Sequence, residues 1–402
     1  GTLKGWTEKK PEESDRPARR EQVSAWDRLV RAAAATKGEK TSPTLTTESG
    51  GDLLKLLRTM ERPSKVTGVT AAGDLVPDER ALAAVSDKSL VFFRHDGGVV
   101  REVPIRGGAD LVTVARGEDS TAPVLVMAST YGSTVRGYSA DGRELWSYVR
   151  SGRQIGSMIV ARPPGGTADS IYVGYLDGTG LRVLGTDGQV RFASRRLTGI
   201  TALTAGDIPG TGWRVVASTG NSGGFFSPGG PLLSRMPEEE DSTVQVGLLA
   251  LDDSQPSAPL LQVASVGGSE YVLRRVRPDN SPVWTVPLAQ GIRNAEPVGL
   301  VVARLRLPSS EGSEGNETPA AQGGVGGTRP FAVTLLSDGR VTVTSPDGSV
   351  MWRGKAVFGG TAVSGDLEHV ASSLTAADLD GDGEDELYIG GEGHVLQIVT
   401  GN

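Results

Sequence analysis

The sequence contains no cysteine, and its three histidines, His95, His369 and His394, stand far apart. Without thiols the chain cannot form disulfides or a thiolate metal site. The histidines have no potential metal ligands at the usual spacing, and no Gly-x-Ser-x-Gly elbow or Lys-Ser/Thr phosphate loop is present. We therefore expect a protein that is not an enzyme. No apolar run approaches the roughly 20 residues that a membrane-spanning helix needs.

Positive charge is also in short supply, because the formal net charge of the 402 residues is −7. Nucleic acids bind to basic surfaces, so nucleic acid is not an expected partner. Glycine, in contrast, is abundant at 56 residues, about twice its usual share, which indicates many tight turns between short strands. Since the first residue is Gly1 rather than Met, we expect a processed or trimmed chain, with any membrane anchor outside it.

From Lys65 onward one pattern recurs at the spacing of about 40–50 residues that is typical of β-propeller blades. Each copy holds short apolar strands, a loop that often carries Asp, and a hairpin turn before a last strand that often carries Trp. Asp-Gly between apolar runs predicts a hairpin because both turn residues adopt positive φ. These pairs occur at Asp96-Gly97, Asp141-Gly142, Asp187-Gly188 and Asp347-Gly348. The sequence predicts an all-β fold, a seven-bladed β-propeller of four-stranded antiparallel blades over residues 65–402.

The seventh copy lacks its fourth strand. Residues 1–8 contain GTLKGW, which ends in Trp6 much as other copies end in Trp146, Trp284 and Trp352. We expect residues 1–8 to supply the missing outer strand beside His394–Val399 and to close the ring, since closure removes exposed strand edges. The alternative is a disordered tail.

The remaining segments are given simpler interpretations. Residues 9–64 are expected to form a charged linker with two short helices, at 25–35 and 52–61. Residues 309–328 are a low-complexity loop inside blade six. Phe225 and Phe226 are expected to lie in the core, or else to form an exposed patch. The tryptophans are expected to pack between neighbouring blades. The run Arg274-Arg275-Val276-Arg277 is expected on a solvated edge, or opposite an acidic partner.

The strongest local motif is DLDGDGEDELYIGG, near the end of the chain. Asp378, Asp380 and Asp382 alternate, and Glu386 closes the set, while Glu384 would add its backbone carbonyl. Several carboxylates on a short glycine-containing loop provide the oxygen ligands that Ca²⁺ prefers. The twelfth position is Ile389 rather than the Glu of an EF-hand, and the flanking residues predict a strand. We expect one calcium site, formed by Asp378, Asp380, Asp382, Glu384 and Glu386.

This loop, running into the strand LYIGG, resembles the FG-GAP/VCBS repeat of integrin-α-like β-propellers. The resemblance implies a calcium-binding blade; only one blade keeps the full motif, which argues against transferring integrin ligand binding. The Trp-bearing hairpins, such as YSADGRELW, more weakly resemble PQQ quinoprotein dehydrogenases and BamB-type propellers. In those enzymes the cofactor lies near a calcium and a disulfide of adjacent cysteines, and this chain has no cysteine.

Together these features predict a non-catalytic, calcium-stabilised propeller that serves as a protein-protein interaction or scaffold module. Two alternatives remain open: an enzyme acting at the central channel, such as a quinoprotein-like oxidoreductase, and a carbohydrate-binding propeller. Calcium loops of this kind fill where calcium is millimolar, so we expect an extracytoplasmic location. The alternative location is inside the cell, within a large complex.

Overall fold

The computed structural model describes residues 42–62, 64–76, 80–105, 107–118, 122–238, 244–268, 270–289, 295–306, 327–358 and 370–401. The chain divides into two compact units, one of Gly1–Ser42 with Gly359–Ser364 and one of Pro43–Phe358 with Gly365–Asn402. Every strand of the described part lies in the second unit. No helix within these ranges is long and apolar enough to cross a membrane.

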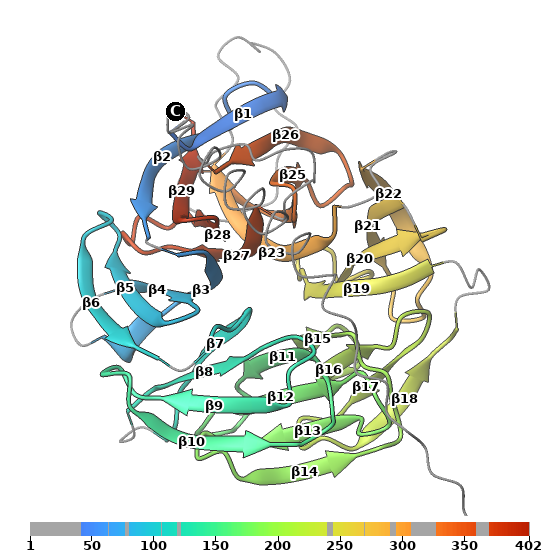
Figure 1. The fold of residues 1–402 in the computed structure, drawn as a ribbon. Coiled ribbons are helices and arrows are strands. Elements are labelled where there is room, and N and C mark those ends of the chain that lie inside the picture. Colours follow the sequence, from blue (N-terminus) through green and yellow to red (C-terminus); the bar gives the residue numbers. More distant parts are fainter. Residues whose placement is uncertain are drawn as a thin grey trace, which may run out of the picture. The chain divides into compact units, whose positions relative to one another are not determined.

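The described strands form seven antiparallel sheets around a central axis (Figure 1). Blade one holds β3 (Val66–Ala71), β4 (Ala81–Ser86), β5 (Ser89–Arg94) and β6 (Val99–Pro104), and blade two holds β7 (Leu111–Ala115), β8 (Val124–Ala128), β9 (Thr134–Tyr138) and β10 (Glu144–Val149). Blade three holds β11 (Ile155–Ala161), β12 (Ser170–Tyr175), β13 (Leu181–Leu184) and β14 (Val190–Ser194), and blade four holds β15 (Ala202–Ile208), β16 (Gly212–Ser218), β17 (Gly223–Phe226) and β18 (Leu232–Met236). Blade five holds β19 (Val244–Leu251), β20 (Leu260–Val266), β21 (Glu270–Val276) and β22 (Pro282–Ala289), and blade six holds β23 (Pro297–Arg306), β24 (Thr328–Leu336), β25 (Arg340–Thr344) and β26 (Val350–Val357). Blade seven holds β27 (Ala371–Ala377), β28 (Glu386–Gly391) and β29 (His394–Thr400), completed by β2 (Leu54–Glu61). The predicted all-β, seven-bladed propeller is confirmed.

The strand that closes blade seven is β2, which pairs antiparallel with β29 and sets Leu56 opposite Ile398. The prediction that residues 1–8 form this strand was therefore wrong in the segment it chose; those residues lie outside the described ranges. The helix predicted at 52–61 was also wrong. Leu54–Glu61 is a strand in which Leu54 and Met60 are buried, while Lys55, Thr59 and Glu61 are exposed. It is extended because the free edge of β29 offers backbone partners to an extended chain. The helix predicted at 25–35 lies outside the described residues.

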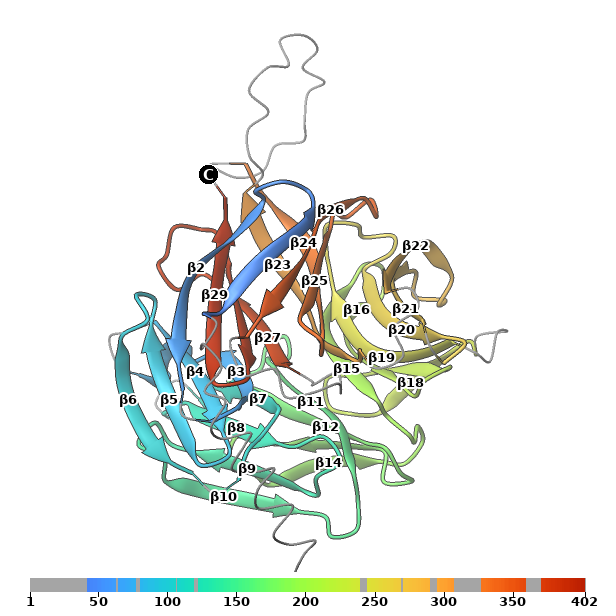
Figure 2. The same ribbon diagram turned by 45° about the horizontal axis from the view of Figure 1, so that its top comes forward.

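A second strand from the same region, β1 (Thr44–Ser49), pairs with β26 and makes blade six five-stranded. The linker interpretation of these residues was therefore wrong. Figure 2 shows β1 and β2 side by side across blades six and seven. The segment before blade one thus joins two neighbouring blades rather than one.

Tryptophans at equivalent positions hold neighbouring blades together, as expected. The indole Nε1 of Trp146 in blade two donates to the carbonyl of Thr186 in the outer turn of blade three, at 2.8 Å. Trp284 in blade five makes the same bond to Pro346 of blade six, at 3.0 Å. Trp352 is fully buried in a core shared by blades six and seven. Phe225 and Phe226 are also buried, so their core interpretation is confirmed.

The outer turns of blades two and six carry aspartates whose ionisation stabilises the fold. The hydroxyls of Ser139 and Ser345 donate to Asp141 and Asp347, and these hydrogen bonds hold the pKa of both carboxyls below the ordinary value. A carboxyl whose pKa is lower in the folded than in the unfolded state stabilises the fold above about pH 4, and this contribution disappears as the pH falls through the folded pKa. We expect the free energy of unfolding in urea to fall less steeply below pH 4 in the Asp141→Asn/Asp347→Asn variant than in the wild type. If the free energy of unfolding fell equally steeply with pH in both proteins, these aspartates would not contribute to the pH dependence of stability.

Candidate metal centre

The predicted calcium loop connects β27 to β28 in blade seven. Side-chain oxygens of Asp378, Asp380 and Asp382 all lie within 4.8 Å of one another. Asp378 is half-buried, and the other two are exposed. Gly381 and Gly383 adopt positive φ of 84° and 91°, a conformation that L side chains rarely adopt. The glycines thus allow the curl that brings the three aspartates together.

Backbone hydrogen bonds fix this curl. Asp378 accepts the N–H of Gly381 through Oδ1 at 2.6 Å and that of Gly383 through Oδ2 at 3.2 Å. Asp380 accepts the N–H of Asp382 at 3.1 Å through Oδ1. The carboxylates are therefore held on one side of the loop before any ligand is considered.

The spacing fits a single hard cation. Calcium–oxygen bonds are about 2.3–2.6 Å long, so two oxygens on opposite sides of one ion lie about 4.6–5.2 Å apart. No two of the three aspartate oxygens lie farther apart than 4.8 Å, so all three can reach one ion. Calcium takes about six to eight oxygens, and backbone carbonyls and water would have to supply the others.

Glu386, the first residue of β28, lies below the loop and is 6% exposed. Its Oε2 accepts the N–H of Leu379 at 3.0 Å. Burial raises the pKa of this carboxyl, and the negative charges of Asp380 and Asp378 raise it further. Like charges crowded around a buried carboxyl are costly, and a bound cation would relieve that cost.

The Glu384 carboxylate is not part of the aspartate cluster and has other partners. Its Oε2 accepts the hydroxyl of Thr400 at 2.8 Å, and its Oε1 forms an ion pair with Arg306. The sequence prediction assigned only its backbone carbonyl to the metal, and that role stays a prediction. The carboxylate instead ties the loop to the end of β29 and to blade six.

Arginines from the two neighbouring blades also contact the loop, and the sequence did not predict these contacts. Arg80, which precedes β4 of blade one, donates to the carbonyl of Asp378 at 3.2 Å. Arg304 of β23 in blade six lies 3.3 Å from Asp385, whose carboxylate raises the pKa of the guanidinium. The loop therefore lies at a seam between blades six, seven and one. An Arg-x-Arg pair at the end of β23 is the only sequence signal for this contact, and it is a weak one.

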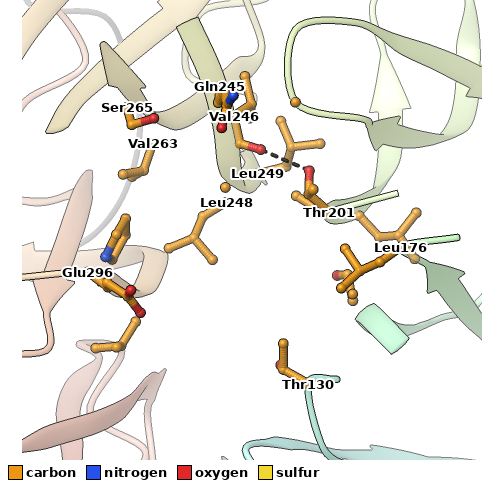
Figure 3. Close-up of a pocket in the computed structure, with 18 of the residues that line it drawn as sticks. Thr130, Leu176, Thr201, Gln245, Val246, Leu248, Leu249, Val263, Ser265 and Glu296 are labelled. Carbon is orange, nitrogen blue, oxygen red and sulfur yellow. Dashed lines mark hydrogen bonds between the residues drawn. The ribbon is translucent and has the colours of Figure 1, made fainter. Parts of the chain in front are cut away.

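A separate cavity of about 580 Å³ opens where the innermost strands begin (Figure 3). Thr201, whose hydroxyl donates to the carbonyl of Val246 at 2.9 Å, lies on its wall. Asp110 and Glu296 are the charged residues among the described lining. Burial and the charge of Glu296 raise the pKa of Tyr271. This is the place where an enzyme of the alternative hypothesis would act.

The histidines do not contribute to this cavity within the described residues. His95 lies in the outer turn of blade one, where its carbonyl accepts a hydrogen bond from Arg58. His394 begins β29, with Nδ1 3.0 Å from the carbonyl of Glu392. His369 lies outside the described residues. His95 and His394 therefore lie on different elements, and neither lines the cavity.

Comparison with solved structures supports the propeller architecture. The crystal structure of BBS1N in complex with ARL6DN, soaked with mercury, matches 87% of this chain and 98% of its own, with a TM-score of 0.59 and 12% identity. Virginiamycin B lyase from Staphylococcus aureus matches 86% of this chain and 99% of its own, with a TM-score of 0.54 and 10% identity. Both are seven-bladed β-propellers. At these identities the likeness establishes the fold alone.

No protein-family model matches the sequence. No curated protein matches it either. The class of this protein is therefore set by its architecture: a seven-bladed β-propeller with a carboxylate-rich loop in the blade that closes the ring.

Proposed function

We propose that this protein is a non-catalytic, calcium-stabilised propeller that acts as a protein-protein interaction or scaffold module. The observation that carries the proposal is the gathering of Asp378, Asp380 and Asp382 oxygens within 4.8 Å on the loop of the closing blade. Asp378, Asp380 and Asp382 would hold the ion, with Glu386 beneath them and the carbonyl of Glu384 as a further ligand. The FG-GAP/VCBS character of the repeat belongs to the same proposal.

The position of the loop favours a structural role for the ion. Arg80 of blade one and Arg304 and Arg306 of blade six already contact it. Blade seven is also the blade in which a strand from the start of the described chain meets the last strand. A cation there would compensate the crowded carboxylates and stiffen the seam, because binding to the folded state alone stabilises that state.

Two findings favour an interaction role. BBS1N, which shares the fold, is crystallised with a protein partner, ARL6DN. Among the described residues, seven of the eight exposed large apolar side chains lie on the outermost strands of the blades; they are Leu57, Val99, Leu145, Val149, Val190, Leu233 and Val283. The eighth, Tyr131, lines the cavity described above. Apolar side chains on an outer rim offer contact area to a partner. An extracytoplasmic location belongs to the proposal, since calcium is millimolar there.

An enzyme acting at the central channel is the second candidate. It is favoured by the cavity of about 580 Å³ with Asp110 and Glu296 on its wall, and virginiamycin B lyase shows that this architecture supports catalysis. Fold alone does not decide between the two functions.

Isolation of the tagged protein from its native source tests the interaction role. We expect a defined partner to co-purify in stoichiometric amount from buffer with millimolar calcium. An Asp380→Asn/Asp382→Asn variant, or the wild type in chelator, should retain less partner as the seam loosens. A protein that is isolated alone under all conditions would contradict the interaction role.

A further inference from the structure

The outer rim contains a groove of about 390 Å³ between blades three and four. Blade three contributes Phe192 of β14 and the two arginines that follow this strand, Arg195 and Arg196. Blade four contributes Leu232, the first residue of β18, and Pro231 just before it. Phe192 and Leu232 are half-buried, whereas both arginines are exposed. The groove therefore combines an apolar floor with a positively charged edge.

Blade three departs from the repeat at this groove. Trp146 and Trp284 follow the turn residues Asp141 and Asp279 by five positions, and their indoles pack against the next blade. The residue five positions after Asp187 is Phe192. A phenyl ring is smaller than an indole and has no N–H to donate.

The hydrogen bond that an indole would make is supplied from elsewhere. The carbonyl of Pro228, in the outer turn of blade four, accepts the hydroxyl of Tyr172 at 2.7 Å. Burial raises the pKa of Tyr172 to about 12, so this hydroxyl stays protonated. The two blades are thus joined without a tryptophan, and the space beside Phe192 stays open.

Positive charge is concentrated beside the groove. Arg235 of β18 donates to the carbonyl of Arg196, which brings a third guanidinium to the same edge. Among the described residues, no carboxylate forms an ion pair with Arg195, Arg196 or Arg235. The chain as a whole is acidic, with a net charge of −7. A basic edge on an acidic protein favours an acidic occupant, and guanidinium groups bind carboxylates through paired hydrogen bonds.

We propose that this groove binds an extended acidic segment of a partner protein. An apolar side chain of the segment packs against Phe192 and Leu232, and flanking carboxylates bind Arg195 and Arg196. The inference rests on the proposed interaction role and names the surface and the partner chemistry for it.

Fluorescence anisotropy with a labelled peptide, Asp-Glu-Glu-Leu-Phe-Glu-Asp-Glu, tests the proposal directly. The wild-type protein should bind it saturably, and a peptide with Lys in place of every acidic residue should not bind. The Arg195→Glu/Arg196→Glu variant should bind at least about tenfold more weakly, because two charge-assisted contacts are lost and reversed. Arg143→Glu changes an exposed arginine in blade two and serves as the matched control, with affinity close to that of the wild type.

A second variant separates loss of the groove from loss of folding. Phe192→Trp places in blade three the residue that blades two and five carry, so it should fold with an unchanged melting temperature while filling the groove. Its affinity for the peptide should fall. No saturable binding, or equal weakening by Arg143→Glu, would overturn the groove proposal and indicate general attraction between charges only. If the native partner co-purifies equally well with the Arg195→Glu/Arg196→Glu variant, the groove proposal is wrong while the interaction role stands.

Discussion

Deletion of residues 1–61 is expected to abolish cooperative unfolding of the propeller. The deletion removes β2, so β29 loses the backbone partners on its outer edge and keeps those of β28. It also removes Leu54 from the core between blades six and seven and Met60 from the core between blades seven and one. Loss of one such buried side chain costs about 2–5 kcal/mol, and the total stability of a protein is about 5–15 kcal/mol. Urea denaturation followed by circular dichroism would measure the effect.

Deletion of residues 1–42 is the matched control, because it leaves β1 and β2 in place. This shorter deletion should leave the unfolding midpoint unchanged. A deletion of residues 1–50 removes β1 alone and should have an intermediate effect, since β1 is an exposed fifth strand. Wild-type stability after removal of residues 1–61 would show that ring closure does not depend on β2.

Replacement of Arg275 by Met is expected to cost about 3–5 kcal/mol, because removal of one partner leaves the other charge buried and unpaired. Arg275 is 0% exposed and Asp252 is 2% exposed. The guanidinium forms an ion pair with Asp252, donates to the carbonyl of Ala258 at 3.1 Å and lies 5.7 Å from the Trp284 ring centre. Chemical denaturation of the purified variants would measure the loss.

A double-mutant cycle isolates the ion pair from simple packing. The Asp252→Leu/Arg275→Met variant buries no charge at this site and should recover most of the stability that Arg275→Met loses. Arg277→Met, which changes an exposed neighbour, should alter the free energy of unfolding by no more than about 0.5 kcal/mol. If the two substitutions changed the free energy of unfolding additively, the buried ion pair would be contradicted.

The same arginine shows why a charged residue is hard to place from sequence. The solvated edge predicted for Arg274-Arg275-Val276-Arg277 was wrong for Arg274 and Arg275, because both are buried, at 4% and 0% exposure. Arg277 is exposed, as predicted. A charged residue is expected in solvent unless its partner is known. Asp252 lies 23 residues earlier in the chain, and only the pairing of strands within blade five brings it to the guanidinium.

The propeller itself could be predicted because its signals are local and repeated. The Asp-Gly turns and the Trp positions recur in corresponding places. Gly97, Gly142, Gly188 and Gly348 adopt the expected positive φ. The aspartates before them do not, so the hairpins form with a different turn type from the one predicted. The closing strand could not be assigned correctly, because its conformation depends on a strand that is distant in the sequence. Residues Leu54–Glu61 are few and rich in leucine, so they fit a short helix as well as a strand, and the free edge of β29 decides between the two.

In the metal loop, too, contacts within the loop could be predicted, and contacts from other blades could not. Asp378, Asp380 and Asp382 could be named as one group because their spacing along the chain places them together. Arg80 and Arg304 could not, since they come from different blades and meet the loop only after the ring has closed. Sequence spacing therefore predicts that the three aspartates lie together, but not which arginines surround them.

Titration of calcium into the metal-free protein tests the central claim most directly. Isothermal titration should show a single bound ion per chain, and the melting temperature should rise with calcium, since a ligand at about a hundred times its Kd stabilises the folded state by about 2.7 kcal/mol. The Asp380→Asn/Asp382→Asn variant changes two exposed residues; it should fold, bind no ion and melt at the same temperature in calcium and in chelator. A wild-type protein that takes up no calcium, or whose melting temperature is the same in calcium and in chelator, would contradict the account.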